Sequence, residues 1–84
     1  NDNMALACLH ALQAKNIAVP QQVKIVGFDN ISLSRFCHPS ITTIAQNTEL
    51  MAQQAAKAML EAIGGDMGKQ EFIIPVTLCE RQST

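Results

Sequence analysis

The sequence predicts an α/β fold in which helices alternate with short strands of a parallel sheet. A helix-forming stretch at 3–15 is followed, after a short loop, by the nearly continuous apolar run Val-Lys-Ile-Val-Gly-Phe at 23–28. Such a run is typical of a strand buried on both faces of a parallel sheet, and helix, loop and buried strand form the repeating unit of a doubly wound sheet. Ligands of these sheets bind beyond the carboxyl ends of the strands, which is the position of Asp29.

The first helix is expected over residues 3–15, with Asp2 as its N-cap. A carboxylate at this position accepts hydrogen bonds from the free amides of the first turn. Asn16 is expected to end the helix in a left-handed conformation, and Pro20 prevents its continuation. Leucines recur at helical spacing and form the apolar face, at Leu6, Leu9 and Leu12.

The rest of the chain adds one helix and two extended segments. Residues 31–40 are expected to be irregular, 41–45 extended, and 48–63 helical. Residues 71–79 have the pattern of a strand, and Pro75 places that strand at a sheet edge or bends it, because proline donates no ladder hydrogen bond. Three strands do not make a self-sufficient sheet, so we expect the rest of the fold to lie outside this sequence.

Composition and charge exclude several classes of function. The 84 residues suffice for one small domain. Of these residues, 48% are hydrophobic and only 15% are charged. The six Lys and Arg residues are scattered and the formal net charge is −1, so the chain has no basic stripe for DNA. No apolar run approaches the roughly 18 residues of a membrane span.

Neither a metal site nor a catalytic site is predicted. The three cysteines form no Cys-x-x-Cys pair and are expected to be buried free thiols. His10 and His38 have no carboxylate or cysteine at metal-ligand spacing. The serines lack both the glycine-flanked elbow and the His-acid pair that nucleophilic catalysis needs. We therefore expect no catalytic residues, no cofactor and no enzymatic activity.

Four stretches together resemble the effector-binding core of the LacI/GalR family of transcription regulators. Each is a short motif, and all four occur in the family's order and spacing. They are Asn1-Asp2-x-Met4-Ala5, then Val26-Gly27-Phe28-Asp29-Asn30 after Val19-Pro20, then Pro39-x-Ile41-Thr42-Thr43-Ile44-x-Gln46, and finally Arg81-x-Ser83-Thr84. The resemblance covers essentially the whole chain, which corresponds to the C-terminal part of the family's longer core.

The resemblance implies a two-lobed periplasmic-binding-protein-like (type I) fold, with parallel sheets flanked by helices and the effector in the cleft between the lobes. Residues 1–45 and 70–84 would belong to the C-terminal lobe. Residues 46–69 would supply a helix and crossovers of the N-terminal lobe. The helix-turn-helix DNA-binding head of the family would lie upstream and is absent from this chain.

In functional terms, the resemblance implies the effector-sensing and dimerisation part of a bacterial repressor that responds to a small sugar or nucleoside. Such a protein is cytoplasmic, forms a homodimer, and binds operator DNA only through its N-terminal head. A periplasmic sugar-binding protein of a transport system shares the fold and remains the alternative. The Thr-Thr-Ile-x-Gln crossover, the Arg-x-Ser-Thr ending and the three cysteines favour the repressor.

By the resemblance, Asn1 and Asp29 match positions that contact the effector. The chemistry suits sugar hydroxyls, because carboxylate and carboxamide groups form charge-assisted or paired hydrogen bonds with them. The alternative for Asp29 is a turn residue that caps the 31–37 segment. The same resemblance places Leu6, His10, Phe36 and Cys37 near the dimer interface, with local packing as their alternative.

Overall fold

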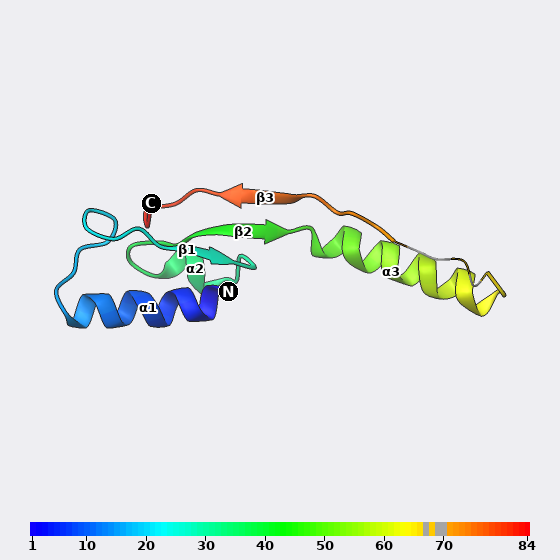
Figure 1. Cartoon of the computed structure of the whole chain (residues 1–84), viewed down its shortest axis with the longest axis horizontal. Coiled ribbons are helices and arrows are strands. Elements are labelled where there is room, and N and C mark those ends of the chain that lie inside the picture. Colours follow the sequence, from blue (N-terminus) through cyan, green and yellow to red (C-terminus); the bar gives the residue numbers. More distant parts are fainter. Residues whose placement is uncertain (67, 69–70) are drawn as a thin grey trace. The chain divides into compact units, whose positions relative to one another are not determined.

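A computed structural model describes residues 1–66, 68 and 71–84 (Figure 1). The chain forms two compact units, the first made of Asn1–Ala45 with Thr77–Thr84 and the second of Gln46–Val76. Helices and strands alternate as the α/β prediction requires. In chain order the elements are α1 (Asp2–Ala14), β1 (Val26–Phe28), α2 (Leu33–Phe36), β2 (Thr42–Gln46), α3 (Thr48–Ile63) and β3 (Val76–Cys79).

Helix α1 begins one residue earlier than predicted, and its N-cap is Asn1. The Asn1 side chain accepts a hydrogen bond of 3.0 Å from the Met4 amide. The prediction that Asp2 is the cap was therefore wrong, because Asp2 is already helical and its side chain is fully buried. Beyond the other end of the helix, Asn16 has a φ of 57°, which confirms the predicted left-handed conformation.

The three strands form one sheet in the order β1-β2-β3. Strands β1 and β2 are parallel, with Gly27 opposite Thr43. Strand β3 is an edge strand, as expected of the segment after Pro75, and its arrow in Figure 1 points opposite to that of β2. The sheet is therefore mixed, and only its β1–β2 part is parallel as predicted.

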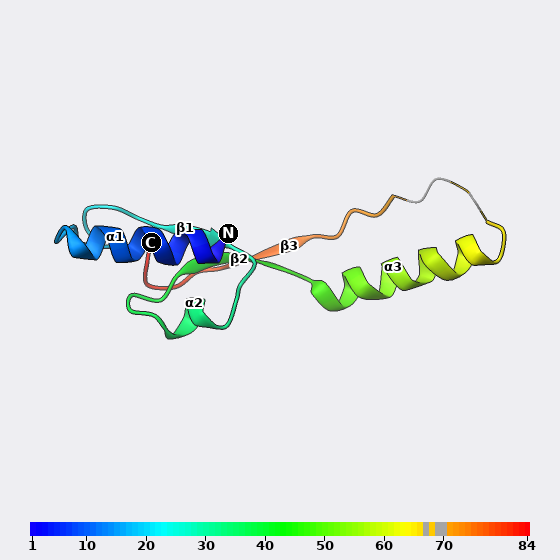
Figure 2. The ribbon, with the colours of Figure 1, turned by 90° about the horizontal axis from the view of Figure 1, so that it is seen from below.

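Strand β1 is shorter than the predicted 23–28 and is covered on one face only. Ile25 and Gly27 are buried, whereas Val26 is 57% and Phe28 42% exposed. Successive side chains of a strand point to opposite faces, and α1 packs along the face of Ile25 and Gly27 (Figures 1 and 2). Within this chain, the predicted burial of both faces was thus wrong.

The interior of the first unit contains about as many polar as apolar residues. The apolar core is Ala5, Leu9, Ile25 and Ile41, with Leu6, Leu12, Val19 and Cys37 packed against it. The buried polar residues are Asp2, Ser34, Thr42, Thr43 and Ser83. Buried polar groups stabilise a fold only when they are hydrogen-bonded, so the network that joins these residues is a main feature of this unit.

The segment predicted to be irregular contains the short helix α2. Its buried Ser34 donates a 2.6 Å hydrogen bond from Oγ to the Ile31 carbonyl, which anchors the helix. The cysteines are free, but Cys8 is exposed and Cys37 and Cys79 are half-buried, so the prediction of buried thiols was wrong.

In the second unit, α3 has the predicted bounds. The side chain of Asn47 caps it by accepting a 3.0 Å hydrogen bond from the Leu50 amide. None of its residues is buried, and Met59, Leu60 and Ile63 are 63%, 69% and 75% exposed. In the part of the chain that the structure describes, no helix is long and apolar enough to cross a membrane.

Candidate functional site

The carboxyl ends of β1 and β2 lie at the same edge of the sheet, because these two strands are parallel. Asp29 follows β1 directly, and its amide donates a 2.9 Å hydrogen bond to the Ile44 carbonyl of β2. The Asp29 residue is exposed at this edge. Its position is therefore the one where α/β sheets bind ligands, as the sequence predicted.

Residues 29–31, here called the Asp29 turn, have an unusual backbone. Asp29 has a φ of 110° and Asn30 a φ of 56°, a region that residues with a side chain rarely adopt. Each of the three amides of the turn has a defined acceptor. After the Asp29–Ile44 bond, the Asn30 amide donates to Thr43 Oγ1 at 3.3 Å and the Ile31 amide to Asp2 Oδ2 at 2.9 Å.

The buried carboxylate of Asp2 connects the start of α1 to this turn and to β2. Its Oδ1 accepts a 2.6 Å hydrogen bond from Thr43 Oγ1, while Oδ2 accepts from the Ile31 amide. Space around it is tight at Gly27, where an added Cβ would overlap Asp2 Oδ1 and lie 3.1 Å from its Cγ. The close approach of α1 to β1 at this point therefore requires glycine at position 27.

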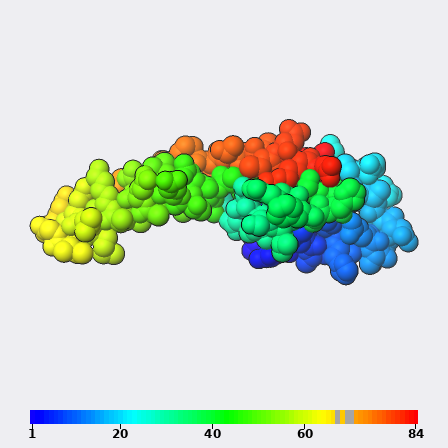
Figure 3. Space-filling model, turned by 180° about the vertical axis from the view of Figure 1, so that it is seen from behind, coloured from blue at the N-terminus to red at the C-terminus, as the bar shows by residue number. Residues whose placement is uncertain are grey.

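Arg81 reaches the same region from the C-terminal segment. Its Nη2 donates a 2.6 Å hydrogen bond to Asn30 Oδ1 in the turn. Its Nη1 donates to Ser34 Oγ and to the Ile41 carbonyl, both at 2.9 Å. Figure 3 shows the C-terminal segment, in red, beside the green residues around α2. One half-buried guanidinium thus links the turn, α2 and the residue before β2.

Ser83, two residues after Arg81, also belongs to this hydrogen-bond network. Its Oγ donates to the Ile25 carbonyl at 2.6 Å and accepts from the Thr42 amide at 2.8 Å. The Ile25 amide in turn donates to the Ser83 carbonyl at 3.0 Å. The C-terminal segment therefore supplies hydrogen bonds that hold the beginnings of β1 and β2.

The sequence singled out neither Asp2 nor Thr43 nor Arg81 as a part of this site. All three lie inside the quoted motifs, yet the contacts that give them roles join residues far apart in the chain. The available signal was the pair of polar residues, Thr42 and Thr43, in an otherwise apolar extended segment.

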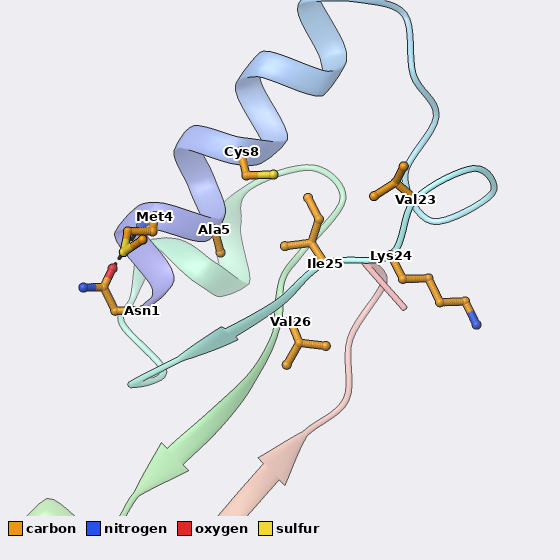
Figure 4. Close-up of a pocket in the computed structure, with 8 residues that line it drawn as sticks. All are labelled: Asn1, Met4, Ala5, Cys8, Val23, Lys24, Ile25 and Val26. Atoms are coloured by element: carbon orange, nitrogen blue, oxygen red, sulfur yellow. Dashed lines mark hydrogen bonds between the residues drawn. The ribbon is translucent and has the colours of Figure 1, made fainter.

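Asn1, the second predicted effector residue, borders a hollow of about 420 Å³ (Figure 4). Its lining is mostly apolar and comes from α1 and from the chain leading into β1: Asn1, Met4, Ala5, Cys8, Val23, Lys24, Ile25 and Val26. Asp29 is not among these residues, so the hollow does not bring the two predicted residues together. Their connection runs instead through Asp2, which follows Asn1 and binds the Asp29 turn.

The four predicted interface residues divide into two pairs. Phe36 is 76% exposed and His10 is also exposed. Leu6 and Cys37 are half-buried and pack against the core. The Cys37 thiol also donates to the carbonyls of Ser34 and Pro39, at 3.4 and 3.3 Å. Leu6 and Cys37 thus make local packing contacts, whereas His10 and Phe36 lie mainly at the surface.

Across residues 1–66, 68 and 71–84, no three His, Cys, Asp or Glu side chains are grouped so that they would hold a metal ion. The polar groups at the sheet edge are instead a carboxylate, an amide and backbone groups. Carboxylate and amide groups of this kind form hydrogen bonds with polar ligands.

The alternation of helices and strands, together with a polar edge at the carboxyl ends of β1 and β2, fits the class of periplasmic-binding-protein-like domains. Residues 1–84 match the family model of the periplasmic binding protein-like domain. The chain belongs to this family, in the branch of the LacI-type transcription regulators.

Three relatives illustrate the similarity. The HTH-type transcriptional repressor PurR of Histophilus somni (strain 2336) is 37% identical over 76 residues, 90% of this chain and 22% of the repressor. A periplasmic binding protein/LacI transcriptional regulator from Alkaliphilus metalliredigens QYMF, solved with D-xylulofuranose, has a TM-score of 0.89 and 35% identity, covering 100% of this chain and 32% of its own. The lac repressor dimer, solved bound to operator and the anti-inducer ONPF, has a TM-score of 0.90 and 31% identity, covering 100% and 29%.

Proposed function

We propose that this chain is part of the effector-sensing and dimerisation core of a bacterial transcription repressor that responds to a small sugar or nucleoside. The observation that carries the proposal is the exposed residue Asp29 at the shared carboxyl edge of β1 and β2, in a turn whose three consecutive backbone amides are all hydrogen-bonded. A carboxylate on a turn with an ordered backbone suits recognition of paired hydroxyl groups. The D-xylulofuranose bound to the Alkaliphilus protein supports a sugar as the ligand.

The chain spans between a fifth and a third of the length of the three relatives described above, so the remaining pocket residues would come from segments outside it. We assign residues 1–45 and 70–84 to the C-terminal lobe and 46–69 to the N-terminal lobe. The compact units support this division, although the first unit resumes only at Thr77. The exposed apolar residues of α3 support it too, because a helix of this kind is normally buried against further elements.

In this proposal an effector between the lobes favours one lobe arrangement over the other. The change in operator affinity is limited by the difference between the effector's affinities for the two lobe arrangements. The DNA-binding heads lie outside this chain, and the operator-bound dimer of the lac repressor supports such an assembly. The repressor relatives favour this function over solute capture in the periplasm.

The effector role of Asp29 is tested in the full-length natural protein by calorimetric titration with D-ribose, D-xylulose, D-glucose and adenosine. For the compound that binds, Asp29→Ala is expected to weaken affinity at least about tenfold, since a hydrogen bond to a charged group contributes about 1.5–3 kcal/mol. Asp66→Ala, which removes an exposed carboxylate of the second unit, serves as the matched control. Equal affinities of Asp29→Ala and the natural protein would exclude Asp29 as an effector ligand.

A dimer contact through α2 predicts a second result. Phe36→Glu is expected to weaken dimerisation of the full-length protein about 30-fold, because truncating or charging a buried aromatic anchor costs about 2 kcal/mol or more. Sedimentation across a concentration series measures the shift to monomer. The exposed Gln53→Glu variant, on α3, controls for the one added negative charge. An unchanged dimer with Phe36→Glu would place the interface elsewhere.

A further inference from the structure

The strained Asp29 turn needs support from its surroundings, and part of that support comes from the far end of the sequence. A residue at a φ of 110° keeps this conformation only when neighbouring groups fix it. The backbone amides of the turn are held by α1 and β2, through Asp2, Thr43 and Ile44. The Asn30 side chain is held separately, by the guanidinium of Arg81.

The Arg81 contact with Asn30 is the shortest of the guanidinium's three hydrogen bonds. It is 2.6 Å long, against 2.9 Å for the bonds to Ser34 and Ile41, and all three are charge-assisted because the guanidinium carries a positive charge. The other two bonds fix the guanidinium itself, so Arg81 acts as a rigid support for Asn30. Lysine would not replace it, because a single ammonium group lacks the planar fork that reaches three acceptors.

We propose that Arg81 is a positioning residue of the effector site: it holds Asn30, and through Asn30 the left-handed turn that presents the Asp29 carboxylate. The proposal has two parts. The first, that Arg81 keeps the Asp29 turn ordered, concerns the protein alone and can be tested without a ligand. The second, that losing this order lowers effector affinity, rests on the proposed function.

Hydrogen exchange on the full-length natural protein tests the structural part without any ligand. In Arg81→Gln, the amides of Asn30 and Ile31 are expected to exchange about tenfold faster relative to α1 amides such as that of Leu9. Arg81→Lys is expected to lie between Arg81→Gln and the natural protein, and Arg35→Gln, at an exposed arginine of α2, to leave the turn unchanged. Equal acceleration of the turn and of α1 would show general destabilisation and overturn the proposal.

The functional part is tested by a double-mutant cycle with Asn30→Ala, using the compound from the D-ribose, D-xylulose, D-glucose and adenosine titrations that binds. Arg81→Gln is expected to weaken its affinity about tenfold, and Arg81→Gln/Asn30→Ala no further, because both changes release the same contact. Additive losses, or no loss, would overturn the positioning role. An Asp29→Ala variant with unchanged affinity would instead refute the proposed function, whatever the exchange of the turn shows.

Discussion

Gly27→Ala is expected to lower the free energy of unfolding by about 3 kcal/mol, the upper end of the usual cost of overpacking. The new methyl group would overlap Asp2 Oδ1 and approach its Cγ to 3.1 Å. Asp2 has little freedom to withdraw, since its two oxygens are held by Thr43 Oγ1 and the Ile31 amide. Urea unfolding of the full-length protein measures the loss.

Gly64→Ala is the matched control, because a Cβ at position 64 would meet its nearest atoms only at 3.5 Å. We expect this control to change stability by less than about 0.5 kcal/mol. In an Asp2→Ala background, Gly27→Ala is expected to cost under about 1 kcal/mol, because the clashing carboxylate is gone. A full loss in that background would show that the clash with Asp2 is not the cause.

Asp2→Ala is expected to cost about 3 kcal/mol, since each buried donor left without an acceptor costs about 1–3 kcal/mol. The variant deprives both the Thr43 hydroxyl and the Ile31 amide of their acceptor. The substitution also removes a buried carboxylate, whose desolvation is unfavourable, and this lowers the net loss of stability. Unfolding of the full-length protein in urea gives the stability, and hydrogen exchange of the Ile31 amide reports the local change.

Asp2→Asn distinguishes hydrogen bonding from charge. Its carboxamide oxygen still accepts from Ile31, and its NH₂ donates to the Thr43 hydroxyl oxygen, so we expect a loss of only about 1 kcal/mol. If Asp2→Asn were as unstable as Asp2→Ala, the negative charge itself, at the first turn of α1, would be the stabilising feature.

The helices were predictable because their signals are local. The leucine spacing and Asn16 predicted α1 to within one residue at either end, and the bounds expected for the helix at 48–63 agree with α3. The first and third strands were predicted too long, whereas the segment expected at 41–45 was found one residue further on, as β2. Val23 and Ile25 have strand-forming side chains, but the Val23 amide binds the Ala18 carbonyl and Ile25 binds Ser83 of the C-terminal segment. No local pattern reveals a contact 58 residues away.

Of the residues that build the candidate site, only the exposed Asp29 could be predicted from the sequence. Asp29 follows a recognisable strand, so its place at the sheet edge follows from the fold class. The support beneath it depends on Asp2 and Arg81, whose partners lie 29 and 51 residues away in the turn. A carboxylate beside a helix start predicts a cap from local rules, and only tertiary packing turns it into the buried acceptor found here.

A crystal structure of the full-length natural protein with its bound sugar or nucleoside tests the central claim most directly. We expect the ligand at the carboxyl ends of β1 and β2, with a hydroxyl group donating to the Asp29 carboxylate within the usual hydrogen-bond range of about 2.5–3.0 Å. The Asp29 turn should keep its hydrogen bonds to Asp2, Thr43 and Arg81. A ligand seated at another edge, with Asp29 pointing into solvent, would contradict this account.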